Sequence, residues 1–335
     1  MFVAMCATAD LLDLDHGRRY VFDAIHKCVA QAAGKPERER DKCLAVGLER
    51  QATAWVAYML WPFAAMAYVD DTDHSSSWDM ISTPTAPMTS EDAERHRAHC
   101  PWKSLLLRDR YTCFFNKALD KECPQEYRSR LNFDYASRLQ AAHIFNIAAV
   151  ALHPESNELQ SLSTTLGILQ DYCRIHRSVV QTIINTPDNA QNSLLLSVEA
   201  RLDFDGFNWC LKATKTPHRY RICYMPDNER YEGRRATSDH VTFADHSAEF
   251  DAPKHVTSSS PIAGVALPNA DLLRMHCALA HVLHLSGAAE LFEVLAYTAD
   301  HVSPTGAAFM ARVVDEDPYA VIELQETLAE MLNPQ

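Results

Sequence analysis

The sequence predicts an α+β protein that is mainly helical around a small strand–strand–helix centre. Apolar residues recur at helical spacing near both ends of the chain, which favours helices there. Two short apolar runs, Leu139–Val150 and Leu194–Leu196, lie in the middle, and a helical pattern begins near Ser197. The chain has 335 residues, of which 47% are hydrophobic, so it is long enough to bury a substantial core.

The N-terminal part, from about Gly17 to Val69, is predicted to be helical. One helix face is marked by four residues spaced four apart: Tyr20, Ala24, Cys28 and Ala32. Gly34 and the proline that follows it end this helix. Residues 70–90 are polar and contain two prolines, which is typical of a linker or surface loop. A capping residue before acidic side chains predicts a further helix from Thr89 to about Arg108.

The remaining elements are predicted from composition and spacing. Strands are expected at Tyr111–Phe115, His218–Met225 and Val241–Phe243. Helices are expected at Thr164–Ile184, Ala270–Leu295 and Ala307–Leu332, and loops at Asn185–Asn192 and Asp251–Pro268. The three histidines of the 270–295 helix are interpreted as packing residues: His276, His281 and His284. We divide the chain into a helical region 1–104, a central region 105–292 and C-terminal helices 293–335.

Composition narrows the function classes. The formal net charge is -13, which argues against a nucleic-acid partner, because phosphate neutralisation needs a basic surface. Lys103, Arg108 and Arg110 form a modest basic cluster that we interpret as a solvated face. The ten cysteines form no CxxC pair, so we expect free, mostly buried thiols in a reducing compartment. Early acidic residues argue against a signal peptide, and we expect a cytoplasmic protein without a membrane span.

The most apolar run, Ala54–Val69, is sixteen residues long and contains Pro62. It is short for a bilayer span, and a helix interior disfavours proline, so it predicts a buried helix pair or one kinked helix. Its aromatic residues include Trp55, Tyr58, Trp61 and Phe63. Two interpretations stay open for them: packing in a hydrophobic core, or the wall of a pocket that binds a small lipophilic molecule.

Four motifs follow one another through the central region. They are Arg108-Asp-Arg-Tyr-Thr-Cys113, Gln140-Ala-Ala-His-Ile-Phe145, Asn192-Ser-Leu-Leu-Leu and Asp203-Phe-Asp205. Together with the segments around Thr216 and 272–290, this order resembles the fungal HNH-nuclease-domain proteins over about 105–292. The resemblance implies a small ββα-metal centre. Arg110 and Ser193 replace two glycines of the family pattern, and Asn146 replaces a proline.

The resemblance also implies roles for individual residues. His143 takes the place of the general base, and Asn192 would orient its imidazole by a hydrogen bond. Positions 201 and 205 would share a helix face and hold a divalent ion. This chain has Arg201 where the family has a histidine ligand, and a guanidinium has no electron pair for a metal. We therefore expect a degenerate centre without metal or other cofactor, in which Asp205 pairs with Arg201.

Three functions remain as hypotheses. The first is a repurposed, metal-independent enzyme that cyclises, isomerises or rearranges a small lipophilic natural product, with His143, Asn192, Arg201 and Asp205 as the catalytic set. The second is a metal-dependent HNH endonuclease that uses Asp205 and a distant ligand. The third is a catalytically silent pseudo-nuclease that binds a partner. Structural alternatives also stay open, because His143 could be a core histidine, Asn192 a turn residue and Arg201–Asp205 an ordinary helix pair. The sequence does not predict an oligomeric state.

Overall fold

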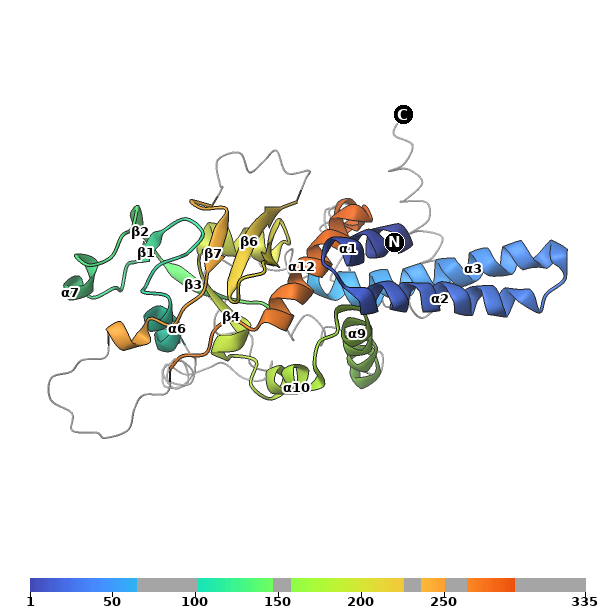
Figure 1. Cartoon of the computed structure of the whole chain (residues 1–335), viewed down its shortest axis with the longest axis horizontal. Coiled ribbons are helices and arrows are strands. Elements are labelled where there is room, and N and C mark those ends of the chain that lie inside the picture. Colours follow the sequence, from blue (N-terminus) through green and yellow to red (C-terminus); the bar gives the residue numbers. More distant parts are fainter. Residues whose placement is uncertain (65–101, 147–157, 226–235, 251–263, 293–335) are drawn as a thin grey trace, which may run out of the picture. The chain divides into compact units, whose positions relative to one another are not determined.

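The structure is a computed structural model that describes residues 1–64, 102–146, 158–225, 236–250 and 264–292 (Figure 1). The fold is α+β and mainly helical, as predicted. The chain divides into two compact units, and each is built from segments far apart in the sequence. Unit 1 comprises Met1–Asp71, Ile147–Val180 and Ala278–Gln335, and unit 2 comprises Thr72–Asn146 and Gln181–Cys277.

Unit 1 is built from helices. Their bounds are α1 Phe2–Leu11, α2 Asp15–Ala33, α3 Glu37–Trp55 and α9 Glu158–Cys173. Helices α2 and α3 run antiparallel, side by side, as a helical hairpin (Figure 1). Gly17 of α2 lies against α9, because a Cβ atom at this position would be 2.8 Å from the carbonyl oxygen of Tyr172. The hydroxyl of Tyr172 donates to the carbonyl of Met5 over 2.7 Å and so connects α9 to α1.

Helix α3 passes directly into a π-helical turn, Val56–Leu60, and then into helical residues 61–64. The described part of the apolar run, residues 54–64, is therefore one continuous helix that is distorted, which agrees with the kinked-helix alternative. The distortion lies just before Pro62, whose ring lacks the N–H group that would bond to the preceding turn. A π-turn is one of the established ways in which a helix accommodates such a local irregularity.

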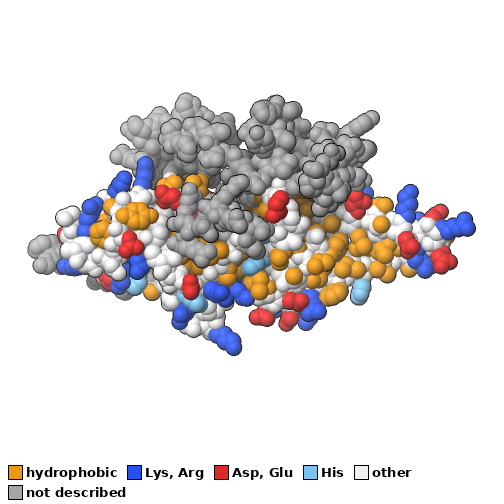
Figure 2. Space-filling model, turned by 90° about the horizontal axis from the view of Figure 1, so that it is seen from above, with side chains coloured by type: hydrophobic (Ala, Val, Ile, Leu, Met, Phe, Trp, Pro, Cys, Tyr) orange, Lys and Arg blue, Asp and Glu red, His pale blue; other side chains and the backbone are white. Residues whose placement is uncertain are grey.

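Figure 2 shows one face of the molecule, on which hydrophobic side chains gather over the helices of unit 1. Exposed apolar residues of these helices include Val3, Phe22, Val29 and Val46. The end of the α2–α3 hairpin, residues 35–42, carries exposed side chains of alternating charge (Figure 2). Within the described part of the chain, no helix combines the length and the apolar character that a membrane crossing requires.

The described strands of unit 2 form three small sheets. The first pairs β1 Ala118–Asp120 with β2 Tyr135–Ser137 in parallel, and the second pairs β3 Leu139–His143 with β4 Ser193–Ser197 antiparallel. The third has the order β5 Trp209–Ala213, β6 Arg219–Tyr224 and β7 His240–Thr242. The helices are α6 Trp102–Arg108, α7 Gln125–Arg128, α10 Arg177–Asn185, α11 Val198–Asp205 and α12 Ala270–Leu285; α10 and α12 extend across the unit boundaries. Short 3-10 turns lie at Ala190–Asn192 and Ser247–Glu249.

The β4–α11 segment follows from its local sequence. Leu194, Leu195 and Leu196 are fully buried, so both faces of β4 are covered and the strand is continuously apolar rather than alternating. Ser197 ends the strand and caps α11, since its hydroxyl oxygen accepts from the backbone N–H of Ala200 over 3.3 Å. The indole N–H of Trp209 donates to the carbonyl of Ala200 over 3.1 Å, which fixes α11 to β5.

Arg108 corrects the expectation of a solvated basic face. Its side chain is fully buried at the end of α6. The guanidinium pairs with Asp109 and donates to the carbonyls of Ala190, Ser193 and Ala266 at 2.7–3.1 Å. A planar group with five donors can satisfy several acceptors at once, so Arg108 joins two separate segments, the start of β4 with the turn before it and the stretch around Ala266, to the end of α6.

Three predicted elements differ from the structure. Tyr111–Phe115 is not a strand, because Arg110 and Tyr111 both have φ of 55°, and only an isolated bridge from Thr112 to Leu119 remains. The predicted helix 164–184 is interrupted after Cys173, where Arg174 has φ of 54°. The 270–295 helix ends at Leu285, and Gly287 with φ of 74° precedes a second helical segment, 288–292.

Other expectations agree with the structure or lie outside it. The strands near 218–225 and 241–243 and the helix that begins near Ser197 are confirmed with small shifts of their ends. Strands β1, β2 and β5 were not predicted. The expected linker 70–90, most of the loop 251–268 and the helices within 307–332 fall outside the described residues. The division at residues 104 and 292 stays a prediction.

Candidate functional site

His143 lies at the end of β3, opposite Ser193 of β4. Its side chain is 14% exposed, and Nε2 lies 2.9 Å from Oδ1 of Asp188, which is 45% exposed. Asp188 belongs to the loop between α10 and the 3-10 turn before β4. An ionised carboxylate can only accept, so the neutral imidazole that fits this contact donates a hydrogen bond from its Nε2–H to Asp188 and keeps its lone pair on Nδ1. A histidine held in this way is suited to general acid–base chemistry.

Asn192 is fully buried, and its side chain bonds to backbone groups. Nδ2 donates to the carbonyls of Phe145 and Pro187 over 2.9 and 3.1 Å, and Oδ1 accepts from the N–H of Phe145 over 2.9 Å. Both amide protons are therefore used. The predicted hydrogen bond from Asn192 to the imidazole of His143 is wrong, because the carbonyls of Phe145 and Pro187 accept both amide protons. Asp188 orients the ring instead.

Arg201 and Asp205 form the predicted pair on α11. Nε of Arg201 lies 3.0 Å from Oδ2 of Asp205, so the expected (i, i+4) ion pair is confirmed. A second nitrogen of the guanidinium donates to Oε1 of Gln140 over 3.1 Å. Since Gln140 belongs to β3, Arg201 joins the helix to the strand. The side chains of Arg201 and Asp205 are 13% and 28% exposed, so the pair is partly shielded from water.

The His143–Asp188 pair and the Arg201 cluster lie on different faces of the β3–β4 sheet. Successive side chains of a strand point to opposite faces, and His143 is three residues after Gln140. Gln140 contacts Arg201 on the face that α11 covers, so His143 points to the other face. The structure therefore brings Arg201 and Asp205 together and gives His143 a separate partner. Of the four predicted residues, only Arg201 and Asp205 lie together, whereas His143 pairs with Asp188 and Asn192 bonds to the backbone.

The aromatic residues of the apolar run pack inside unit 1. Trp55, Trp61 and Phe63 are at most 6% exposed, and Tyr58 is half-buried. The ring of Trp55 lies 4.8 Å from Phe2, and that of Trp61 lies 5.0 Å from Phe292. The core-packing alternative therefore describes these side chains better than a pocket wall.

Unit 1 does contain a cavity of about 410 Å³. Most of its lining is polar or charged: His16, Arg19, Tyr20, Asp23, Ala24, Lys27, Gln51 and Asp171. The indole N–H of Trp55 donates to the hydroxyl of Tyr20, one of the lining residues, over 3.0 Å. Burial is the main reason why the pKa of Tyr20 is raised. The four predicted aromatic residues are not part of the lining.

Helix α12 carries two kinds of histidine. His276 is buried between the rings of Phe204 and Phe207, at 3.8 and 4.6 Å, and its Nε2 donates to the carbonyl of Phe204 over 3.1 Å. Burial lowers its pKa to about 3, so this imidazole is neutral and packs as predicted. His281 is different, because it lies beside two cysteine thiols.

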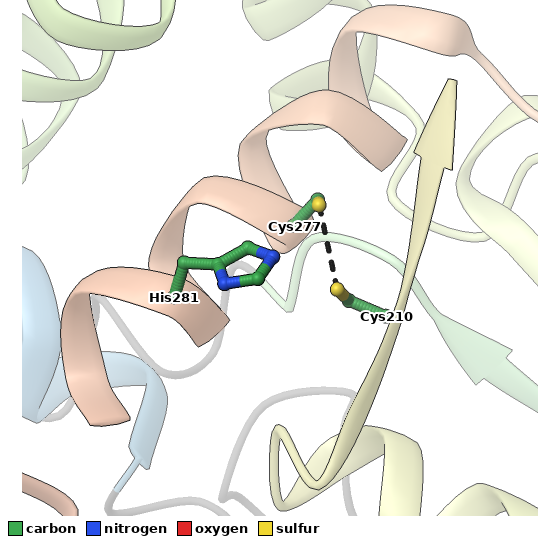
Figure 3. Close-up of side chains that lie close together, drawn as sticks. All are labelled: Cys210, Cys277 and His281. Atoms are coloured by element: carbon green, nitrogen blue, oxygen red, sulfur yellow. Dashed lines mark hydrogen bonds between the residues drawn. The ribbon is translucent and has the colours of Figure 1, made fainter. Parts of the chain in front are cut away.

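The sequence analysis missed this cluster of Cys210, Cys277 and His281 (Figure 3). Their ligand atoms lie within 4.8 Å of one another, and both cysteines are buried. Among the residues that the structure describes, this is the group of three side chains that could hold a metal ion, and it does not lie at Arg201. The (i, i+4) spacing of Cys277 and His281 was the available signal, but Cys210 is 67 residues away from Cys277.

No protein-family model, curated protein or solved structure matches this chain, so the geometry described above is the basis for its function.

Proposed function

We propose that this chain is a degenerate HNH-like protein that has lost metal-dependent phosphodiester cleavage. In this proposal it is a metal-independent enzyme that acts on a small lipophilic molecule by cyclisation, isomerisation or a pericyclic step. The order β3, β4 and α11 supports it, because the resemblance implies a strand–strand–helix order; His143 ends β3, Asn192 directly precedes β4, and Arg201 lies in α11. Fold alone does not specify activity, so the proposal depends on the contacts of these residues.

The observation that carries the proposal is the Arg201–Asp205 ion pair. The carboxylate that would remain as a metal ligand is 3.0 Å from a guanidinium nitrogen. A divalent ion bound to Asp205 would have to displace this cation or sit beside it, and two positive charges a few ångströms apart repel strongly in a partly buried site. Arg201 also donates to Gln140, so the guanidinium is held in place from the strand as well.

The His143–Asp188 pair would supply the chemistry. Nδ1 of His143 would take a proton from one atom of the substrate and return it to another, which is a net isomerisation without any co-reactant. Asp188 would stabilise the imidazolium that exists between the two transfers, as a carboxylate beside a catalytic histidine does. Arg201 and Asp205 would act as positioning residues that fix α11 against β3.

A second candidate function is a catalytically silent pseudo-nuclease that binds a partner. The contacts of Asn192 favour it, because a residue expected to serve the imidazole bonds to the backbone instead. The burial of Trp55 and Trp61 favours it as well, since the wall of a lipophilic pocket would leave these side chains open to the substrate. The third hypothesis, a working endonuclease, would need an intact metal site at Asp205.

Nicking of supercoiled plasmid DNA with Mg²⁺ or Mn²⁺ tests the loss of nuclease function. The natural protein should leave the plasmid intact. The matched control is Arg274→His, because Arg274 forms a similar helix pair with Asp271 on α12, and this variant should also leave the plasmid intact. Arg201→His tests whether one substitution restores metal binding and cleavage. Nicking by the natural protein that is lost in His143→Ala would refute the proposal.

Turnover of small molecules separates the enzyme from the silent binding protein. The natural protein is incubated with a lipophilic extract of cells that contain it, with EDTA present, and substrates and products are followed by mass spectrometry. A mass-neutral conversion that His143→Ala abolishes and Asp188→Asn slows is expected. Binding of an extract component without any conversion would end the enzyme proposal in favour of the silent one.

A further inference from the structure

Three thiols of unit 2 converge where the β5–β6 sheet meets α12. Cys210 of β5 and Cys223 of β6 are directly opposite each other in the antiparallel register, so their side chains share one face of the sheet. Cys277 of α12 approaches the same place, with its sulfur 3.3 Å from that of Cys210. Hydrogen bonds join the thiol of Cys210 to those of Cys223 and Cys277.

His281 lies one helical turn beyond Cys277 on α12 (Figure 3). The boundary between the two units falls inside this continuous helix, between Cys277 and Ala278. The position of His281 relative to Cys277 is therefore set by helix geometry and does not depend on how the units are placed. A ring nitrogen of His281 lies within 4.8 Å of both the Cys210 and Cys277 sulfurs.

We propose that Cys210, Cys223, Cys277 and His281 form a structural zinc site of the Cys₃His type. Zinc in proteins is bound tetrahedrally by thiolates and imidazoles, with Zn–S distances of about 2.3 Å. Two sulfurs on such a tetrahedron lie about 3.8 Å apart. The 3.3 Å between the sulfurs of Cys210 and Cys277 is slightly shorter than this value, and the 4.8 Å limit of the three-residue cluster is about 1 Å longer, so side-chain movements of about 1 Å would close the site.

Cys223 would complete the four ligands. Its sulfur makes a weak contact of 3.9 Å with the carbonyl of Arg221, and its side chain is only half-buried. It lies outside the three-residue cluster, so it would turn toward the ion from its place opposite Cys210. With four protein ligands the site is closed, which is typical of structural rather than catalytic zinc.

The ligand types of this cluster, three thiols and one imidazole, also favour zinc over magnesium or calcium. Thiolates and imidazole select zinc over magnesium or calcium, which prefer oxygen ligands. A thiol binds an ion as the thiolate, so binding releases the proton of each cysteine ligand and the affinity depends on pH. The competing fate of two sulfurs so close together is a disulfide between Cys210 and Cys277.

The experiment measures zinc in the full-length protein purified with a reducing agent and without chelators. Elemental analysis should give one zinc per chain in the natural protein. Cys277→Ala should lose it, whereas Cys113→Ala should keep it; Cys113 is the matched control, since it is an equally buried free cysteine of unit 2 outside the cluster. His281→Gln should bind zinc more weakly, and this variant is less disturbing because the side chain is only half-buried.

Cobalt substitution then identifies the ligands. Co²⁺ bound by thiolates should give charge-transfer bands in the near ultraviolet that weaken in Cys223→Ala and disappear in Cys277→Ala. A natural protein that binds no zinc under these conditions would overturn the proposal. So would an intact mass that shows a Cys210–Cys277 disulfide in freshly purified protein, or full zinc binding by Cys277→Ala. Because the assay uses no DNA and no small-molecule substrate, its result is independent of the function proposed above.

Discussion

Replacement of Asn192 by alanine tests the structural role that the geometry gives this residue. The substitution removes two hydrogen bonds donated to carbonyls and one accepted from an N–H group. Two of the three backbone partners belong to Phe145, which is 3% exposed, so water cannot readily replace the lost bonds. Leaving a buried polar group without a partner costs about 1–3 kcal/mol.

The expected loss of stability follows from these contacts. The N–H and carbonyl of Phe145 together account for about 2–6 kcal/mol, and the carbonyl of Pro187 adds less because it is half-buried. We therefore expect Asn192→Ala to lower the free energy of unfolding by about 4 kcal/mol. The matched control is Asn185→Ala, because Asn185 is exposed and accepts one weak bond from Gln181, so its loss should cost less than about 0.5 kcal/mol.

Urea denaturation followed by tryptophan fluorescence measures the difference in midpoint between the variants. Hydrogen exchange of the peptide that contains Phe145 gives a second, local readout, since its N–H should lose protection in Asn192→Ala even if the global transition is not two-state. A change below about 1 kcal/mol with unchanged exchange at Phe145 would refute the argument. Asn192 would then be free to serve the imidazole, as the resemblance implies.

Three further predictions follow from single contacts. Gly17→Ala should destabilise unit 1 by about 1–2 kcal/mol in thermal unfolding, because the added methyl group would overpack against the Tyr172 carbonyl 2.8 Å away, and this outweighs the gain in helix propensity. The control Gly34→Ala should be neutral, because the space around Gly34 is open. Arg108→Met should cost about 3–5 kcal/mol or prevent folding, because it leaves a carboxylate and three carbonyls unpaired; an unchanged urea midpoint would contradict the described network. Asp188→Asn should move the proton of His143 from Nε2 to Nδ1, because the asparagine amide can donate a hydrogen bond to Nε2. The ¹⁵N chemical shifts of the imidazole report this change, and retention of the original tautomer would show that the 2.9 Å contact does not hold the ring.

The sequence determined those parts of the protein that depend on neighbours along the chain. Ser197 caps α11 because a short polar side chain follows a buried apolar run, and Arg201 pairs with Asp205 because residues four apart share a helix face. The mainly helical fold class was predictable for the same reason, since helical spacing is a local pattern. The ends of helices were less predictable, because single residues such as Arg174 adopt positive φ without a glycine to indicate it.

Only the tertiary structure decided which distant residues meet. Asp188 is 45 residues from His143, and the pairing depends on the β3–β4 register and on the loop that precedes β4. Asn192 bonds to the backbone of Phe145 because the residues after β3 lie beside the residues before β4, a pairing that no local pattern encodes. The thiols of Cys210 and Cys277 come together for a similar reason: a strand and a helix are brought into contact by packing, and packing depends on the shapes of many side chains at once.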